Sequence, residues 1–279
     1  MVPAISVAFI LPKSASEHGV EIDSLFNWSM ILISIVFFIV QPVLFIFAYK
    51  YRGRKGQKAS YYEHNDKLEL IWTVVPAVVL AVLITWGLNT WGDIMNPENE
   101  EKPMVVELYA QQFAWTARYS GGDNQLGYAN VNLIEGKNAL GVDMSNPSAG
   151  DDFTTKEIHL PVNKPVLFRF RSQDVIHSAY MPHFRAQMNC VPGMITQFQF
   201  TPTVTSAEMS AEPYVIKQIN DINEIRAEIG EDPYEFGYIL LCNKICGSAH
   251  YNMQLPIIVE SEEAYNKWVK EQKTLAESL

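Results

Sequence analysis

The sequence predicts a two-helix transmembrane hairpin followed by an all-β Greek-key domain. Two apolar segments in the first third of the chain are each close to the roughly 20 residues that a membrane-spanning helix requires. After Asn96-Pro97 the chain changes to short β-branched or alternating runs separated by Pro, Gly and Asn. Its 279 residues suffice for one sizeable soluble domain and a small membrane anchor.

The first apolar segment runs from about Phe26 to Tyr49 and is nearly free of charge, and the second runs from about Leu70 to Leu88. Pro42 and Pro76 lie inside them, which membrane helices tolerate better than soluble helices do. Two buried helices of a soluble core are the alternative. It is disfavoured because the first segment is apolar on all faces rather than amphipathic. We therefore predict a transmembrane hairpin over residues 26–96.

The loop between the two segments, residues 50–67, sets the predicted orientation. It holds only two acidic residues, and its basic residues are Lys50, Arg52, Arg54, Lys55, Lys58 and Lys67. Positively charged loops stay in the cytoplasm, so both ends of the chain would lie on the opposite side. We predict a multi-pass protein of the bacterial inner (cytoplasmic) membrane with its C-terminal domain in the periplasm. Residues 1–25 would be extracytoplasmic too, and their apolar start, Val2–Leu11, resembles an interfacial stretch more than a signal peptide.

Seven β-rich runs predict a small Greek-key sandwich or barrel over residues 97–279. Two stretches do not fit a compact sandwich and are predicted inserts: residues 121–152, which look like a long surface loop, and residues 201–233. Within the second insert, Ile219–Ile229 has helical spacing, and residues 262–278 predict a terminal amphipathic helix. The β-rich runs are Met104–Ala110, Phe113–Tyr119, Glu157–Leu160, Val166–Arg171, Ile195–Phe200, Tyr238–Leu241 and Leu255–Val259.

The excess negative charge lies entirely in the predicted β domain. The chain carries a net charge of −10, and 24 acidic against 14 basic residues follow Asn96. Such a domain repels nucleic acid and attracts basic partners, although ordinary solubility also explains an acidic surface. We therefore expect no nucleic-acid partner.

The segment from Cys242 to Met253 carries the predicted chemistry. It presents two thiols, the imidazole of His250 and a thioether within twelve residues, and soft sulfur ligands with imidazole select copper or zinc. A structural zinc site requires four Cys or His ligands, whereas Met is a usual weak copper ligand. A mononuclear blue-copper site uses one Cys, so the second, Cys246, allows both sulfurs to bridge two coppers. A Cys242–Cys246 disulfide in an oxidising compartment is the alternative.

Each copper would then need its own nitrogen, and the best upstream candidate is His177. It follows a predicted strand and precedes Pro182, so we expect it on a loop at a strand end. A lone histidine in such a place is more often structural than a ligand, so this assignment depends on the complete set. His159 and His183 are expected to be structural or exposed, and Cys190 is expected to be a small buried side chain.

The pattern Cys-x3-Cys-Gly-x2-His-x2-Met resembles the dinuclear copper (CuA) loop of cytochrome c oxidase subunit II. The resemblance covers almost the whole chain. Leu68–Thr73 followed by Pro76 is similar to the family's second-helix signature, and Gln112–Trp115 is similar to its aromatic strand. His177-Ser178 followed by Val191-Pro192-Gly193 is similar to the segment that supplies the first histidine. The resemblance implies a cupredoxin fold for the β domain.

Two copper ions and six ligands are implied by this resemblance. Both cysteines would bridge both coppers, and each copper would gain one histidine and one weaker ligand. The implied ligands are Cys242 and Cys246 as bridges, His177 with Met253 on one copper, and His250 with the backbone carbonyl of Lys244 on the other.

Three further residues take their expected roles from the family. Glu69 would mark the start of a proton path into the catalytic subunit, although a carboxylate there can equally be a helix-capping charge. The family's electron-accepting tryptophan corresponds to Phe113, and Trp115 is retained two residues later, so both are candidates for that step. Lys244 stands where relatives usually carry a Glu that helps to hold magnesium against subunit I, so the resemblance does not extend to that magnesium site.

The implied function is electron transfer within a membrane oxidoreductase. The copper centre would accept electrons from cytochrome c and pass them to haem in subunit I, where oxygen is reduced and protons are pumped. Expected partners are subunits I and III, and a cytochrome c or a membrane-attached cytochrome c domain. The inserts could dock a cytochrome c or a quinol-oxidising complex in a larger assembly, or they could equally be inert loops. The chain lacks Cys-x2-Cys-His, so haem is expected in the partner subunit only.

Three alternative functions share parts of this pattern. A nitric oxide reductase subunit with the same copper centre is the first, and Glu69 with the two-helix hairpin favours the oxygen-reducing class over it. A quinol oxidase subunit without copper would have lost the ligands that are present here. The membrane hairpin and the full ligand set argue against a simple copper carrier.

Overall fold

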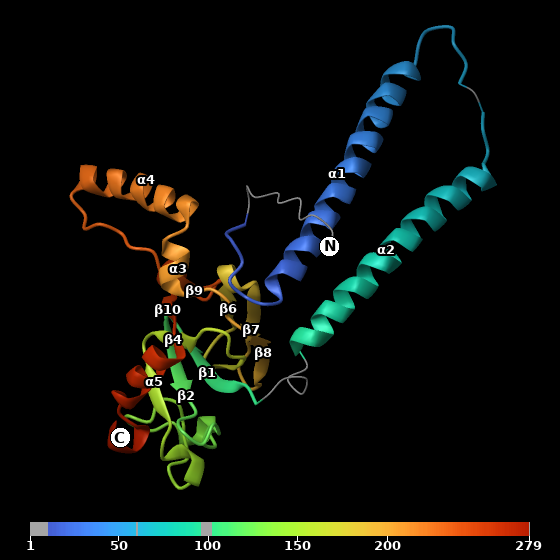
Figure 1. Ribbon diagram of the computed structural model, residues 1–279. Helices are drawn as coiled ribbons and strands as arrows, with labels where there is room; N and C mark the ends of the chain where they lie inside the picture. Colours follow the sequence, from blue (N-terminus) through green and yellow to red (C-terminus); the bar gives the residue numbers. More distant parts are fainter. Residues whose placement is uncertain (1–10, 60, 96–101, 279) are drawn as a thin grey trace. The chain divides into compact units, whose positions relative to one another are not determined.

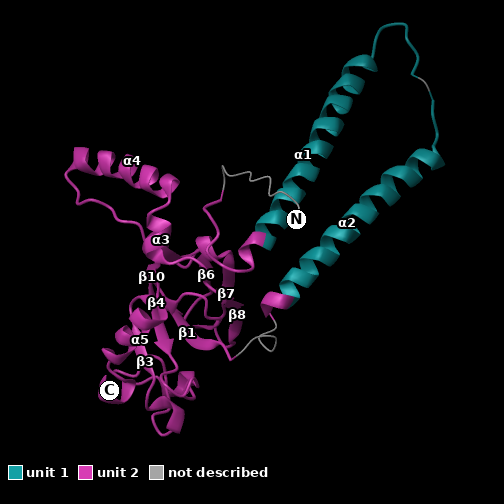
Figure 2. Ribbon diagram, in the orientation of Figure 1, with its two compact units in different colours: residues 1–10, 21–92 teal, residues 11–20, 93–279 magenta. Residues whose placement is uncertain are grey.

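A computed structural model of the chain describes residues 11–59, 61–95 and 102–278. These residues form two units (Figure 2), and each is considered by itself. One unit holds residues 21–92, and the other holds residues 11–20 and 93–279. The predicted interfacial stretch before Leu11 and the predicted boundary at Asn96-Pro97 lie outside the described residues.

The first unit is a pair of long helices, α1 (Gly19–Lys50) and α2 (Asp66–Met95) (Figure 1). Both are long and apolar enough to cross a membrane, with mean hydropathies of 2.8 and 2.3 over their most apolar windows. Pro42 lies inside α1 and Pro76 inside α2, as predicted. Both helices are longer than the predicted apolar segments. Polar residues at their ends continue the helical backbone hydrogen bonding, which hydrophobicity alone does not indicate.

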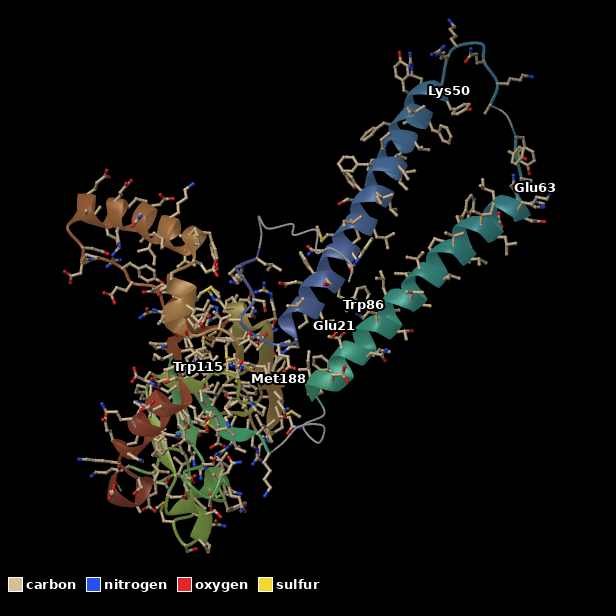
Figure 3. All side chains as sticks on the ribbon, viewed as in Figure 1. Glu21, Lys50, Glu63, Trp86, Trp115 and Met188 are labelled. Atoms are coloured by element: carbon tan, nitrogen blue, oxygen red, sulfur yellow. The ribbon has the colours of Figure 1, made fainter. Side chains whose placement is uncertain are left out.

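One carboxylate links the two helices. Oε1 of Glu21, near the start of α1, accepts hydrogen bonds from Trp86 Nε1 at 3.1 Å and from Thr90 Oγ1 at 2.9 Å, near the end of α2 (Figure 3). Such a contact between the first turns of one helix and the last turns of the other fixes their antiparallel register.

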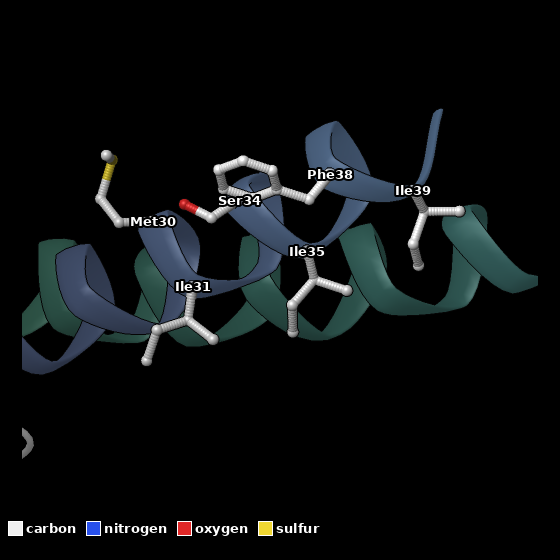
Figure 4. Close-up of a pocket in the computed structure, with 6 residues that line it drawn as sticks. All are labelled: Met30, Ile31, Ser34, Ile35, Phe38 and Ile39. Carbon is white, nitrogen blue, oxygen red and sulfur yellow. The ribbon is translucent and has the colours of Figure 1, made fainter. Parts of the chain in front are cut away.

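An open pocket runs along α1 and is lined by that helix alone (Figure 4). Its single polar lining residue is Ser34. A surface of this composition is unfavourable in water and favourable against lipid tails or another membrane helix. The lining residues are Met30, Ile31, Ser34, Ile35, Phe38 and Ile39.

The second unit contains a sandwich of two five-stranded sheets, with strand orders β3-β2-β1-β5-β8 and β4-β10-β9-β6-β7. β1 runs parallel to β5 and β10 parallel to β4, while the other pairs are antiparallel. Neighbouring strands that are distant in sequence give the Greek-key arrangement, and the predicted fold class is confirmed. The strands are β1 (Met104–Gln111), β2 (Ala114–Tyr119), β3 (Phe153–Thr155), β4 (Ile158–Pro161), β5 (Val166–Ser172), β6 (His177–Met181), β7 (Ala186–Cys190), β8 (Thr196–Phe200), β9 (Tyr238–Cys242) and β10 (Gln254–Glu260).

The seven predicted runs match seven of these strands to within one residue at each end, but β3, β6 and β7 were not predicted. β6 carries polar residues without alternation, because both of its faces are covered and four of its five residues are buried, whereas β7 does alternate, with Gln187 and Asn189 exposed between more buried residues. The expectation that His177 lies on a loop is therefore wrong, since it opens β6. The predicted terminal helix is also divided, into α5 (Glu262–Lys270) and α6 (Leu275–Ser278).

The predicted surface loop at residues 121–152 is partly built into the core. Leu140, Val142 and Ala149 pack with Tyr109 of β1 and Leu275 of α6 in one buried cluster. Two short 3-10 turns, at residues 131–133 and 147–149, shape the segment. It therefore extends the apolar core of the sandwich.

A buried ion network ties the same segment to the sheet. The Arg118 side chain is 1% exposed, and its Nε donates to Asp152 Oδ2 at 3.1 Å while its Nη1 donates to Glu107 Oε2 at 3.1 Å. Arg171 Nη1 donates to the other Glu107 oxygen at 3.1 Å. These charges are removed from water, so each depends on its partner.

Residues 11–20 belong to the β domain although they lead into α1. The backbone N–H of Ala15 donates to His183 at 2.7 Å, and its carbonyl accepts from Thr203 at 2.8 Å. Ala15 is fully buried and Ser16 is 3% exposed. This segment, called the strap below, is an added strand-like piece of the domain.

Replacing Arg118 with Ala should lower the free energy of unfolding by about 3–5 kcal/mol, because it leaves the buried Asp152 carboxylate without its ionic partner and leaves Glu107 paired with Arg171 alone. The measurement is denaturant unfolding of the detergent-solubilised chain, followed by the fluorescence of the β domain. Lys164→Ala is the control, since the Lys164–Glu262 pair is about half exposed and should contribute less than about 1 kcal/mol. Equal losses in both variants would contradict the network's importance.

Stability should fall as the pH drops from 6.5 towards 4. Burial, helped by the nearby Arg185 charge, lowers the pKa of His183 from 6.5 to about 4, and burial also lowers the pKa of His18 in the strap. The unfolded chain therefore binds protons in this window before the folded chain does, so their stabilising effect is complete above pH 6.5 and is lost below it. We expect a loss of about 3 kcal/mol from His183 by pH 4.

The variant His183→Gln isolates this effect. Its unfolding free energy, measured across the same pH series, should change less steeply between pH 6.5 and 4. An unchanged slope would mean that other groups cause the acid sensitivity.

Candidate metal centre

The cysteine-rich loop connects β9 to β10. Cys242 is the last residue of β9, and its backbone N–H donates to the carbonyl of Met253 at 3.0 Å, directly before β10. A 3-10 turn over residues 250–252 brings the chain back. The loop thus leaves and returns at one place on the sheet, which holds its side chains in a small volume.

His177 reaches this loop from the neighbouring strand. β6 pairs with β9 so that Ala179 lies opposite Cys242, and His177 Nδ1 lies 3.8 Å from Cys242 Sγ. The ligand atoms of His177, Cys242 and Cys246 all lie within 4.8 Å of one another, and all three residues are buried. The structure therefore brings the distant histidine to both cysteines.

The remaining predicted ligands surround the two sulfur atoms. Cys246 Sγ lies 3.6 Å from His250 Nδ1 and 3.6 Å from Met253 Sδ. Cys242 Sγ lies 3.2 Å from the carbonyl oxygen of Lys244. Both cysteines are free thiols, so the alternative of a disulfide between them is not what the structure has.

Asp174 orients the imidazole of His177, a role that the sequence did not assign. Its Oδ1 lies 2.8 Å from His177 Nε2, and its Oδ2 accepts from the backbone N–H of Gln112 at 2.6 Å. A carboxylate at Nε2 favours the proton there and leaves the Nδ1 lone pair directed at the sulfur. The available signal was an acidic residue three positions before the histidine.

The charge of Asp174 is stabilised by these contacts. Burial acts to raise the pKa of this carboxyl, but hydrogen bonds from His177, Gln112 and Val175 together outweigh it and hold the pKa below its ordinary value. Cys246 behaves in the opposite way. Burial and the neighbouring Cys242 thiol raise its pKa to about 11, so a metal must displace a proton from it at neutral pH.

The turn between β1 and β2 fixes the loop from another side. The Gln112 side chain donates through Nε2 to the carbonyl of Cys246 at 2.5 Å. Phe113 has a φ of 91°, and a Cβ on Gly247 would lie 2.8 Å from its ring, so only glycine fits there. A non-glycine residue with positive φ is strained, which is a common feature of functional sites.

The two candidates for electron acceptance differ in exposure. Phe113 is 36% exposed, whereas Trp115 is 2% exposed and donates through Nε1 to the Met253 carbonyl at 3.4 Å. The Trp115 ring also meets the His177 ring edge-on, with centroids 6.1 Å apart. Trp115 therefore lies behind the metal site, and Phe113 lies between that site and solvent. Glu69 lies in the first turn of α2, in the other unit, and its role stays a prediction.

Comparisons with known proteins identify the family. Residues 4–89 match the family model "Cytochrome C oxidase subunit II, transmembrane domain", and residues 104–209 match "Cytochrome C oxidase subunit II, periplasmic domain". The chain belongs to the cytochrome c oxidase subunit II family. It is thus a subunit of a haem–copper oxidase complex, an oxidoreductase, with two transmembrane helices and a periplasmic domain.

Relatives match nearly the full length of this subunit II chain. It is 32% identical to "Alternative cytochrome c oxidase subunit 2" of Bradyrhizobium diazoefficiens over 90% of this chain and 83% of the relative. It is 25% identical to "Cytochrome c oxidase subunit 2" of Thermostichus vulcanus, over 96% and 80% respectively. The periplasmic domain of a Bradyrhizobium japonicum cytochrome oxidase subunit II is 19% identical, covering 61% of this chain and 94% of that domain, with a TM-score of 0.37.

The match to the periplasmic family model ends at residue 209, before the cysteine-rich loop. Cys242, Cys246, His250 and Met253 are therefore outside the matched range. The metal centre rests on the convergence of side chains in this subunit II and not on the family match.

Replacing Asp174 with Ala should weaken metal binding by about 10- to 100-fold, because His177 would lose the partner that sets its tautomer and ring orientation. The measurement is copper affinity by competition with a chelator of known strength. The control is Asp143→Ala, a partly exposed aspartate outside the site. Equal affinities for the Asp174 variant and the unmodified chain would show that His177 is oriented by other contacts.

Proposed function

We propose that the chain is the electron-accepting subunit II of a membrane cytochrome c oxidase, with a dinuclear CuA copper centre in its periplasmic domain. The carrying observation is the grouping of two free, buried thiols with two histidine Nδ1 atoms, a thioether and a backbone carbonyl. Each of the last four groups lies within 3.8 Å of one of the two sulfurs.

The donor set fits copper better than the alternatives. Structural zinc takes four Cys or His ligands in a closed tetrahedron, and the Met253 thioether is a poor ligand for it. A mononuclear blue-copper site uses a single thiolate. Two thiolates close enough to be shared, with separate histidines on either side, are what two coppers bridged by sulfur require.

Six groups would hold the two coppers in this proposal, in two sets around the shared thiolates. One histidine and one weak ligand would complete each set. The bridges are Cys242 and Cys246, the first set adds His177 and Met253, and the second adds His250 and the Lys244 carbonyl. When bound, the pair would supply a one-electron relay whose charge is spread over both metals.

The protein's own residues keep this site from rearranging. Asp174 fixes His177, Gln112 holds the Cys246 carbonyl, and Gly247 lets the loop lie against Phe113. Trp115 closes the inner side and excludes water. A ligand set that moves little between redox states lowers the reorganisation that electron transfer requires, which is the advantage of placing it on a rigid β scaffold.

The same proposal assigns an electron route, a proton path and partner subunits. Electrons from cytochrome c would arrive near Phe113 and leave towards haem in subunit I, where oxygen reduction and proton pumping take place. Glu69 would mark the start of a proton path from the cytoplasmic side of the inner membrane, because the basic loop at residues 50–67 favours that side. Subunits I and III are the expected membrane partners. Lys244 offers no carboxylate for the magnesium site found in relatives.

Electron paramagnetic resonance of the copper-loaded, detergent-solubilised chain tests the proposal. We expect a hyperfine pattern from one unpaired electron shared equally by two copper nuclei, and two coppers per chain by mass spectrometry of the metal. A pattern from a single copper nucleus would overturn the dinuclear assignment.

The variant His177→Ala should lose the shared-electron pattern, because one copper would lack its nitrogen ligand. His159→Ala is the matched control, since that imidazole lies between Glu157 and Glu260 and away from the cysteines. A His177→Ala variant that keeps the native spectrum would mean that another group supplies the nitrogen.

A further inference from the structure

Helix α4 (Pro213–Ile229) carries a stripe of exposed isoleucines that takes no part in the metal site. Ile222, Ile225 and Ile229 are 39%, 62% and 64% exposed. Their spacing of three and four residues places them along one side of the helix. Adjacent isoleucines of this exposure are more than the single apolar side chains scattered over ordinary surfaces, and such patches mark interaction sites.

The helix is firmly built. Pro213 occupies its first turn, and Gly230, with a φ of 76°, ends it in the left-handed conformation. Val215 is buried, and the preceding helix α3 (Ser206–Ser210) begins with a complete capping box from Thr205. A helix fixed at both ends presents its stripe in a defined orientation.

The chain that returns from α4 covers a different flank of the helix. Asn223 Oδ1 accepts from the backbone N–H of Tyr234 at 2.6 Å, and Arg226 Nε donates to the carbonyl of Asp232 at 2.6 Å. Arg226 also pairs with Glu231 at 2.8 Å. Within the described residues, the return segment therefore holds the helix from one side and leaves the isoleucine stripe open.

The surroundings of the stripe are strongly acidic. Between Ser206 and Gly237, eight acidic residues stand against Lys217 and Arg226, which accounts for more than half of the net charge of −10. By helical position, Asp221 and Glu228 lie along one side of the stripe on α4. An apolar stripe with an acidic border complements an apolar groove with a basic border.

A lipid surface is the alternative occupant, because the strap that leads into α1 contacts the start of α4 through the Lys13–Glu212 ion pair. Helices that lie on membranes carry Lys and Arg on the polar face, which attract anionic lipids. The acidic polar face of α4 would be repelled by them. The charge pattern therefore favours a protein.

We propose that α4 is a docking helix for a partner protein whose surface offers an apolar groove bordered by Lys and Arg. This surface is separate from the metal centre. The chain from α4 enters β9 at Tyr238, whereas Cys242 ends that strand, about 13 Å away at 3.3 Å per residue. None of the proposed copper ligands lies on α4, so docking there does not use the metal site.

Site-specific photocrosslinking in native membranes tests the inference. A benzophenone amino acid replaces Ile225, or, in the matched control, Ile216, which is 46% exposed on the opposite side of the same helix. We expect a crosslinked peptide of another protein, with apolar side chains and at least two Lys or Arg residues, from position 225 and at least five-fold less of it from position 216. Raising the salt concentration before illumination should reduce the yield.

Two double variants complete the test, one that removes isoleucines of the stripe and one that reverses the charge of the acidic residues beside it. Ile222→Ser with Ile229→Ser, and separately Asp221→Lys with Glu228→Lys, should each reduce the crosslink from position 225 at least five-fold while copper content stays unchanged. Crosslinks from position 225 to lipid alone, equal yields from both positions, or a yield that survives both variants would overturn the proposal.

Discussion

The pairing of β6 with β9 is the contact on which the metal centre depends. It places Ala179 opposite Cys242, and the backbone N–H of Asn243 donates to the Ser178 carbonyl at 3.0 Å. His177 and Cys242 are 65 residues apart in the chain, so the β6–β9 pairing must close a long segment. Closing so long a segment costs entropy, which the two sheets and their shared core must offset. The cluster of donors is therefore a product of the whole sandwich.

Around that pairing, separate elements restrain the same few atoms. The β1–β2 turn supplies Gln112 and the strained Phe113, the β5–β6 connection supplies Asp174, and the β9–β10 loop supplies both cysteines. Because the restraints come from three parts of the fold, the geometry does not rely on the flexibility of any one loop. Such over-determination is how a protein can hold strained residues where function needs them.

The sequence allowed the general architecture to be predicted for a physical reason. Helices in lipid need apolar side chains on every face, whereas strands of a domain in water have one apolar and one polar face. Both patterns can be recognised in the sequence. β6 was missed because its polar and apolar residues are buried on both faces and do not alternate, and β7 was missed although its apolar residues do alternate with polar ones. Residues 121–152 were not recognised as part of the core, because their Gly, Asn and Asp content is typical of a loop although Leu140 and Val142 are buried.

The ligands of the candidate site could be predicted from the sequence, but the residue that orients one of them could not. Cys242, Cys246, His250 and Met253 are close in sequence, so their spacing alone indicated shared chemistry. His177 is distant from them in sequence and was proposed as the best upstream histidine at a strand end, with the family resemblance in support, and Asp174 was not assigned any role. Supporting contacts of that kind are made in three dimensions by residues with no distinctive spacing. The orientation of a ligand is thus harder to predict than its identity.

The strap has a consequence for how the periplasmic domain is defined. Because Ala15 and Ser16 are buried in the β domain, a fragment that starts after the second membrane helix lacks a piece of its own interior. Such a fragment would expose the backbone groups of His183 and Thr203 that the strap satisfies.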